Sequence, residues 1–342
     1  FSQVIFGPWV LVPNGSLLGF FDWVPKHLRV GKWSLMAAPT LLTLLFTSIY
    51  LRPDHDEEFN HDDHFSTYPD LYSTSWWCSA IIFLFMFGLL SYMMRHPFIV
   101  ATFTILSWIL NMTRHGIHTL VPLIVRDGKP LGYALSLIKF NKVLRFPALS
   151  SASITCFIWN MILVPYLYFV SFDTAEKKRK FLAWNFNFRL SQIHVSNIVY
   201  TLLNTIVLTA GTATNGGSKS MPLPRLFDKE DLWYGQTYGF IYGLFYVLVL
   251  DRVGVHLYPI FSPRSNLVVL TWLGSFGAYF GCFCFWNHVM ETLYDDDHME
   301  YSEPLSLYTL LCFNIIMMGC CGFINYTIEG KVNSVFEINT AK

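Results

Sequence analysis

Charged residues are scarce in this sequence, at 13% of 342 residues, whereas 53% of the residues are hydrophobic. A typical soluble domain holds about 25% charged residues, so a solvent other than water must surround much of this chain. The 23 basic and 23 acidic residues balance to a formal net charge of zero, which excludes a bulk electrostatic attraction to nucleic acid. The composition therefore predicts an integral membrane protein.

The common catalytic and cofactor motifs are also missing. The sequence contains no GxSxG elbow, phosphate-binding glycine loop, dinucleotide fingerprint or CxxCH haem motif. The cysteines lie in apolar runs, and none matches the spacing of zinc ligands. We therefore interpret them as small hydrophobic residues. We expect no metal ion and no cofactor other than bound phospholipids.

A helix needs about 20 apolar residues to cross a bilayer. Several segments approach or exceed this length, and we predict an all-α fold, a polytopic transmembrane bundle of about eight spans. The predicted spans are Trp33–Leu51, Ser75–Met94, Pro97–Val125, Phe146–Phe172, Phe181–Ala210, Leu232–Ile260, Asn266–Met290 and Leu305–Thr327.

Three regions of the chain follow from these spans. Residues 1–32 are expected to form an interfacial, non-spanning N-terminal segment, residues 33–327 the transmembrane bundle, and residues 328–342 a polar C-terminal tail. The basic residues before the first span, Lys26, Arg29 and Lys32, place that end on the positive-inside face of the membrane. The start at Phe1, without a secretory signal, favours a processed chain or a fragment.

Polar side chains inside the apolar segments are the main site candidates, because a charge at the bilayer centre costs about 2.5–3.5 kcal/mol. In the fifth predicted span, Arg189 and His194 accompany Asn185 and Gln192. The i, i+3, i+4 rule puts Asn185, Arg189 and Gln192 on one helical face. This face either belongs to a sealed packing seam between helices or lines a polar cavity.

Asp251 and Arg252 extend this predicted intramembrane polar network into the sixth span. They are adjacent in the sequence and would point about 100° apart on a helix. We therefore expect each of them to meet a different partner.

Two polar connections carry further candidates. The basic run before the fifth predicted span suits contact with lipid headgroups. It consists of Lys177, Lys178, Arg179 and Lys180. The acidic connection after the first span contains His55, His61 and His64. We interpret it as a solvated loop rather than a site for a divalent metal ion.

One segment resembles a known family. His115-Gly116-Ile117-His118-Thr119, followed by Leu120-Val121-Pro122-Leu123-Ile124, is similar to the histidine-containing segment of the FAR-17a/AIG1-like (androgen-induced) membrane hydrolases. The resemblance implies a threonine nucleophile and a histidine base within a helical bundle that cleaves fatty-acid esters of lipids. On this chain it implies His118 as the base, and the stretch Lys32-Trp33-Ser34 offers Ser34 as the nucleophile.

Three classes of function are therefore open. An accessory or scaffolding subunit of a larger membrane complex fits the scatter of polar residues best, and it makes an enzyme the less expected outcome. Its partners would be other membrane subunits and lipids, in an organellar, energy-transducing membrane such as the mitochondrial inner membrane. A lipid-ester hydrolase requires a hydroxyl beside His118. A small-solute transporter or channel requires the polar face around Arg189 and His194 to line a continuous cavity.

Overall fold

The structure is a computed structural model that describes residues 26–53, 68–69, 71–94, 100–126, 129–130, 132–207 and 227–293. Some of the predicted features lie outside the described residues. They are residues 1–25 of the interfacial segment, the connection with His55, His61 and His64, the eighth predicted span Leu305–Thr327 and the tail 328–342.

The chain divides into two compact units. Unit 1 comprises Phe1–Asp56 and Phe227–Val289, and unit 2 comprises Glu57–Leu226 and Met290–Lys342. Unit 1 therefore joins two segments that lie far apart in the sequence. The sequence analysis did not anticipate this division.

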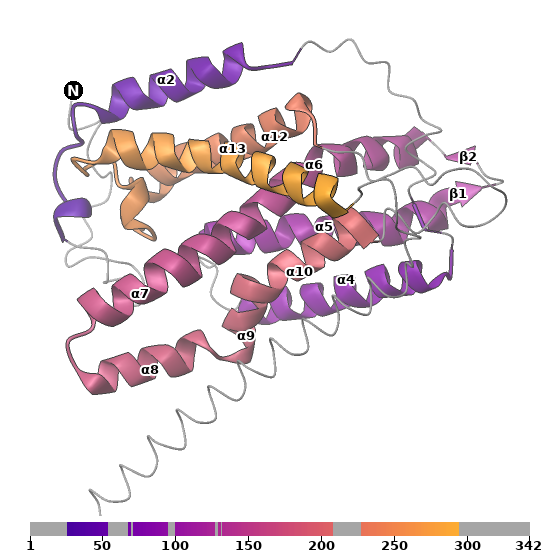
Figure 1. The fold of residues 1–342 in the computed structure, drawn as a ribbon, viewed down its shortest axis with the longest axis horizontal. Helices are drawn as coiled ribbons and strands as arrows, with labels where there is room; N and C mark the ends of the chain where they lie inside the picture. Colours follow the sequence, from indigo (N-terminus) through magenta and orange to yellow (C-terminus); the bar gives the residue numbers. More distant parts are fainter. Residues whose placement is uncertain are drawn as a thin grey trace, which may run out of the picture. The chain divides into compact units, whose positions relative to one another are not determined.

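Unit 1 is built from long helices and the connections between them (Figure 1). Its described helices are α2 (Ala37–Tyr50), α12 (Lys229–Phe245) with a π-helical continuation (Tyr246–Leu250), and most of α13 (Val268–Leu293), with 3-10 turns at Lys26–Leu28 and Pro259–Phe261. The start of α12 is fixed by a capping box. The side chain of Asp228 accepts from the Asp231 N–H (2.9 Å), and the side chain of Asp231 accepts from the Asp228 N–H (3.2 Å).

Unit 2 is helical apart from a short antiparallel pair of strands, β1 (Val125–Arg126) and β2 (Lys129–Pro130). Its helices are α4 (Thr74–Met93), α5 (Phe103–Ile124), α6 (Gly132–Phe157), α7 (Val164–Tyr166), α8 (Ala175–Asn185), α9 (Phe188–Ser191) and α10 (Asn197–Leu202). Between and after them lie π-helical stretches at Ile158–Leu163, Leu167–Ser171, Gln192–Ser196 and Leu203–Val207. Helices α4 and α5 begin at the N-caps Ser73 and Thr102, whose hydroxyls accept backbone N–H groups.

Within the described residues, three helices are long and apolar enough to cross a membrane. They are Thr74–Met93, Gly132–Val170 and Val268–Met290. The protein therefore has the character of a helical membrane protein, while the predicted count of about eight spans is not confirmed. Helix α2 has only 14 residues, fewer than the roughly 20 that a perpendicular span requires.

Three of the predicted spans differ clearly from the helices observed. In the fourth, Phe146–Phe172, the helix already begins at Gly132. The fifth, Phe181–Ala210, is interrupted because α8 ends at Asn185 and the side chain of Asn187 caps a new helix, α9, by accepting the Leu190 N–H at 3.0 Å. The sixth, Leu232–Ile260, ends early because the helix stops at Leu250. Gly254, at φ +78°, then turns the chain back in a left-handed conformation that glycine adopts without strain.

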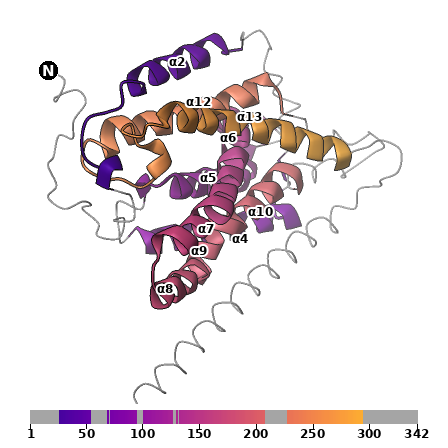
Figure 2. The ribbon, with the colours of Figure 1, turned by 60° about the vertical axis from the view of Figure 1, so that its left-hand side comes forward.

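Helices α4, α5, α6 and α10 lie side by side in unit 2 (Figure 1, Figure 2). The apolar cluster of α4, α5 and α10 includes Trp108, Met86 and Leu203, each of them fully buried. The Trp108 Nε1–H donates to the Met86 carbonyl at 3.1 Å, so the indole brings its own polar group into the core without leaving it unpaired.

Helices α12 and α13 approach closely in unit 1. A Cβ atom on Gly239 would lie 2.4 Å from the ring of Tyr279, which is 4% exposed. Helix α2 is tied to α12 by the Trp233 Nε1–H, which donates to the Ser48 carbonyl at 2.8 Å. Glycine at position 239 is therefore required by the space between two helices and not by backbone conformation.

We predict that Gly239→Ala destabilises unit 1 by about 1–3 kcal/mol, because the new methyl group overlaps the buried ring of Tyr279, which must shift to make space. Gly243→Ala, one turn further along α12, is the matched control, since a Cβ there meets nothing within 4 Å. Alanine's higher helix propensity should leave that variant unchanged or slightly more stable. Thermal unfolding in detergent measures both, and equal melting temperatures would contradict the close approach.

Candidate functional site

The interior of unit 2 holds a polar stripe on α5. Its members recur at helical spacing, so they share one side of the helix. They are Thr104, Ser107, Asn111, Arg114, His115 and His118, with exposed fractions between 0% and 8%. Buried polar groups require hydrogen-bond partners inside the protein, and in this unit the neighbouring helices supply many of them.

Arg114 lies in the middle of this stripe. Its Nε–H donates to Asn141 Oδ1 on α6 (3.1 Å), and Nη1 donates to the Thr205 hydroxyl that follows α10 (2.8 Å). The Asn141 amide group in turn donates to the Tyr68 hydroxyl (2.9 Å). These bonds to neutral oxygen atoms connect the guanidinium of α5 with α6 and with the segment after α10.

A second network joins α5, α6 and α10 through small polar side chains. The Asn111 amide group donates to the Asn197 carbonyl (2.8 Å) and also contacts the Thr201 hydroxyl. The Asn197 amide group donates to the Ser107 hydroxyl (3.0 Å), which also accepts from Ser151 on α6 (3.0 Å). Interhelical bonds of this kind stabilise helix packing in membrane proteins.

Full burial disfavours the charged form of both histidines, and for neutral imidazoles the hydrogen-bond pattern assigns the tautomers. Arginine only donates, so Asn141 Oδ1 faces Arg114 and the amide nitrogen faces His118 Nε2 at 3.2 Å. His118 therefore accepts at Nε2 and carries its proton on Nδ1. His115 is the reverse, because its Nε2 lies 3.0 Å from the Tyr200 carbonyl, which only accepts. Each ring therefore has one basic nitrogen: Nε2 of His118, which the Asn141 amide occupies, and Nδ1 of His115, which has no hydrogen-bond partner among the described residues.

The two residues implied by the family resemblance fall in different units. Ser34 belongs to unit 1, where its backbone N–H donates to the Pro263 carbonyl at 2.8 Å. Within the described part of unit 2, no serine or threonine hydroxyl is hydrogen-bonded to His118, and the Thr119 hydroxyl donates instead to the His115 carbonyl (2.9 Å). A nucleophile hydrogen-bonded to a base is therefore not assembled at His118 in the described structure.

Arg189 does not share a helical face with Asn185. The chain is not helical between α8 and α9, so the predicted i, i+4 relation across that break is wrong. The Arg189 side chain is exposed, and its guanidinium lies 4.7 Å from the centre of the Tyr92 ring, within range of a cation–π contact. Arg189 therefore lies at the surface of unit 2, apart from the buried polar stripe.

Asn185 and His194 are connected through an aromatic residue that the sequence analysis did not select. Trp159 stacks on the buried ring of His194, with centroids 4.0 Å apart and planes 10° apart, and its Nε1–H donates to Asn185 Oδ1 at 2.6 Å. Gln192 accepts the Tyr200 hydroxyl proton at 2.7 Å. His194 and Gln192 occupy a π-helical turn. This conformation is rare in proteins overall, but where it occurs it is often part of a functional site.

Most basic side chains of the run on α8 already interact with side chains close to them in the sequence. Lys177 pairs with Asp173 at 2.8 Å and Lys180 with Glu176 at 2.6 Å, while the Lys178 ammonium lies 5.2 Å from the centre of the Tyr168 ring. These exposed pairs contribute little to stability. They do, however, reduce the positive charge that the run presents to a headgroup.

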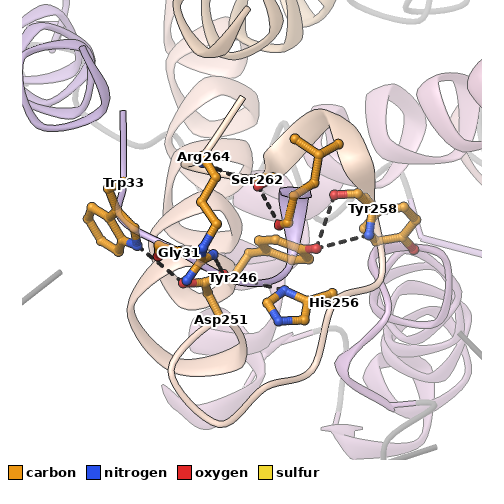
Figure 3. Close-up of polar contacts among 9 residues, drawn as sticks. Gly31, Trp33, Tyr246, Asp251, His256, Tyr258, Ser262 and Arg264 are labelled. Carbon is orange, nitrogen blue, oxygen red and sulfur yellow. Dashed lines mark hydrogen bonds and ion pairs between the residues drawn. The ribbon is translucent and has the colours of Figure 1, made fainter. Parts of the chain in front are cut away.

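Unit 1 contains its own buried polar cluster, centred on Asp251 (Figure 3). The carboxylate is fully buried, and its Oδ1 accepts from Arg264 Nη1 and lies 3.4 Å from His256 Nδ1. Its Oδ2 accepts the Trp33 indole N–H at 3.2 Å. Arg252 instead stacks on the Trp33 ring, 4.5 Å from its centre. Asp251 and Arg252 thus share Trp33 as a partner, against the expectation of a different partner for each, while Asp251 also pairs with Arg264.

Two tyrosines close the loop that carries this cluster. The Tyr246 hydroxyl donates to the Tyr258 carbonyl (3.0 Å) and accepts the Tyr258 N–H (2.9 Å) (Figure 3). These two hydrogen bonds, between one side chain and the backbone of one residue, fix the chain reversal after α12. Asp251 lies within the segment that these bonds close.

Family models, curated proteins and solved structures give no match to this chain. The resemblance at His115–Thr119 therefore stays a prediction. Across the described ranges, no three histidine, cysteine, aspartate or glutamate side chains lie together as a metal ion would require.

The sequence analysis missed several residues that complete these clusters. Trp159 lies in an apolar run that hides its hydrogen bond, whereas Tyr68 and Asn141 lie in the connections between predicted spans. Arg264 lies in a short connection, 13 residues from Asp251. The signal that could have found it is the buried charge itself, since Asp251 inside an apolar segment requires a cation nearby.

We predict that His256 makes the stability of unit 1 depend on pH. Burial lowers the pKa of His256 to about 4, and the attraction of Asp251 is too weak to prevent this beside Arg264 and Arg29. The unfolded chain binds the proton with a pKa of about 6.5, so stability is fully present above that pH and decreases as the pH falls to 4. The loss should be about 3 kcal/mol.

His256→Gln keeps a polar side chain but does not titrate. The difference in melting temperature between the native protein and this variant, measured from pH 7.5 to 4, isolates the histidine from the carboxylates that titrate in both. A difference that stays constant over this range would show that His256 is not held neutral by burial.

Proposed function

We propose that this chain is an integral membrane accessory subunit that scaffolds a larger membrane complex and binds phospholipids between its helices. The observation that carries the proposal is how the buried polar side chains are used. In unit 2, Arg114, Asn111 and Asn197 are hydrogen-bonded to other helices. Polar groups used in this way hold a membrane bundle together.

The outward surfaces of the helices support the same proposal. Large apolar side chains on α13 are exposed, including Leu270 at 68% and Phe285 at 57%. On α4, Ile81 and Leu84 are 62% and 64% exposed. Surfaces of this kind suit lipid tails or the helices of partner subunits. We propose an organellar membrane, such as the mitochondrial inner membrane, as the location.

Purification of the native protein in a mild detergent tests the scaffold proposal, with particle mass and co-purifying subunits determined by mass spectrometry. We expect a stoichiometric particle much heavier than the 39.5 kDa of one chain. A stable monomer or small homo-oligomer, retained across several mild detergents, would overturn the proposal.

A second proposal, a membrane-embedded lipid-ester hydrolase, is supported by one observation. The ring of His115 is oriented by the Tyr200 carbonyl, which leaves the basic Nδ1 in the buried interior of unit 2. An imidazole oriented at one nitrogen and basic at the other is the arrangement that activates a hydroxyl. On this proposal His115 is the base, and His118, with its proton on Nδ1, is a hydrogen-bond donor.

Hydrolysis of fatty-acid esters of lipids by the purified protein tests this proposal. We predict that any such activity falls by at least about 100-fold in His115→Gln, since general base catalysis contributes on the order of 10²–10⁴. The His118→Gln variant should lose less, because glutamine still offers an N–H donor. Absence of hydrolysis by the native protein, or equal activity in the native protein and His115→Gln, would overturn the proposal.

A further inference from the structure

The segment before α2 is tightly attached to the loop before α13. We call residues 28–36 the strap. The Ser262 hydroxyl donates to the Leu28 carbonyl (2.7 Å), and the Arg264 Nε–H donates to the Gly31 carbonyl (3.0 Å) (Figure 3). The Ser34 N–H donates to the Pro263 carbonyl (2.8 Å). These bonds, with that of Trp33 to Asp251, fix the backbone of the strap along its length.

Two of the strap's anchors are charged groups buried beneath it. The side chains of Arg264 and Asp251 are 2% and 0% exposed and form an ion pair. A buried ion pair is rigid because breaking it leaves an uncompensated charge. The strap is therefore a fixed surface and not a loose end.

The outer side of the strap combines exposed apolar and basic side chains. Leu35 is 94% exposed, Val30 56% and Met36 52%, and Lys32 lies among them with an exposed side chain. Residues 28–36 contain no acidic residue. Exposed apolar side chains next to lysine and arginine are typical of segments that lie in the headgroup layer of an anionic membrane.

The position of the strap in unit 1 also indicates that it lies at the level of the lipid headgroups. Its anchor Arg264 comes four residues before α13 begins at Val268, and α13 is one of the helices able to cross a membrane. The start of such a helix lies at the level of the lipid headgroups. A segment bonded to residues 262–264 therefore lies near that level as well.

We propose that the strap is a docking surface for anionic phospholipids of the membrane that α13 crosses. Lys32 contacts the headgroup phosphate, while Leu35 and Met36 insert among the upper parts of the acyl chains. The strap is better suited to this role than the basic run of α8, where Lys177 and Lys180 are paired with Asp173 and Glu176. The proposal does not depend on whether the chain is a subunit of a complex.

The test uses the full-length chain in detergent, titrated with phosphatidylserine, with phosphatidylcholine and with inorganic phosphate, and bound lipid counted by native mass spectrometry. We expect a preference for phosphatidylserine that Lys32→Gln weakens about fivefold, as one basic residue near a surface contributes about 1 kcal/mol. Lys32→Arg should keep the preference. Lys177→Gln, which removes the same charge from an existing ion pair, is the matched control and should change it less than twofold.

A separate variant tests the apolar part of the surface. Leu35→Ser should weaken the binding of both phospholipids by a similar factor, because acyl-chain contacts do not depend on the headgroup. Equal phosphatidylserine preference in the native protein and Lys32→Gln would overturn the proposal, as would an equal loss in Lys177→Gln. Full competition by inorganic phosphate at matched concentration would assign the site to a free anion instead of a lipid.

Discussion

A buried charge among apolar helices must find its hydrogen-bond partners inside the protein, and this constraint organises unit 2. Arg114 is 2% exposed, and transferring a charge into such an interior without partners costs several kcal/mol. Asn141 on α6 and Thr205 after α10 accept from it, so these segments have to lie beside α5. The same bonds fix the orientation of Asn141 and, through it, the tautomer of His118.

Unit 1 satisfies its buried charge with an ion pair. Its buried charge is Asp251, and an arginine neutralises it directly. This ion pair draws the loop before α13 against the strap, because Arg264 also donates to the Gly31 carbonyl. Unit 2 thus connects neighbouring helices through neutral amides, whereas unit 1 connects sequence-distant segments through charge. In unit 1 a single cluster around Asp251 therefore joins the chain reversal after α12 to the segments that precede α2 and α13.

The sequence predicts apolar helices well and their interruptions poorly. The apolar run of α4 ends within one residue of its prediction, because length and hydrophobicity alone determine such a helix. The break before α9 depends on the side chain of Asn187 accepting one backbone N–H, which hydrophobicity does not register. The separation of about 100° between Asp251 and Arg252 predicted a different partner for each, yet both contact Trp33, which lies 218 residues from Asp251 in the sequence. Only the fold brings such pairs together.

The histidines of α5 show why residue type alone does not assign a chemical role. His115 and His118 are one turn apart and equally buried, and the family resemblance favours His118 as a base. Yet Arg114 orients Asn141 so that His118 accepts at Nε2, which leaves a donor at Nδ1. The Tyr200 carbonyl has the opposite effect on His115. The basic nitrogen that no described hydrogen bond engages therefore lies on the neighbouring histidine, His115, because the partner at one ring nitrogen determines which nitrogen is basic.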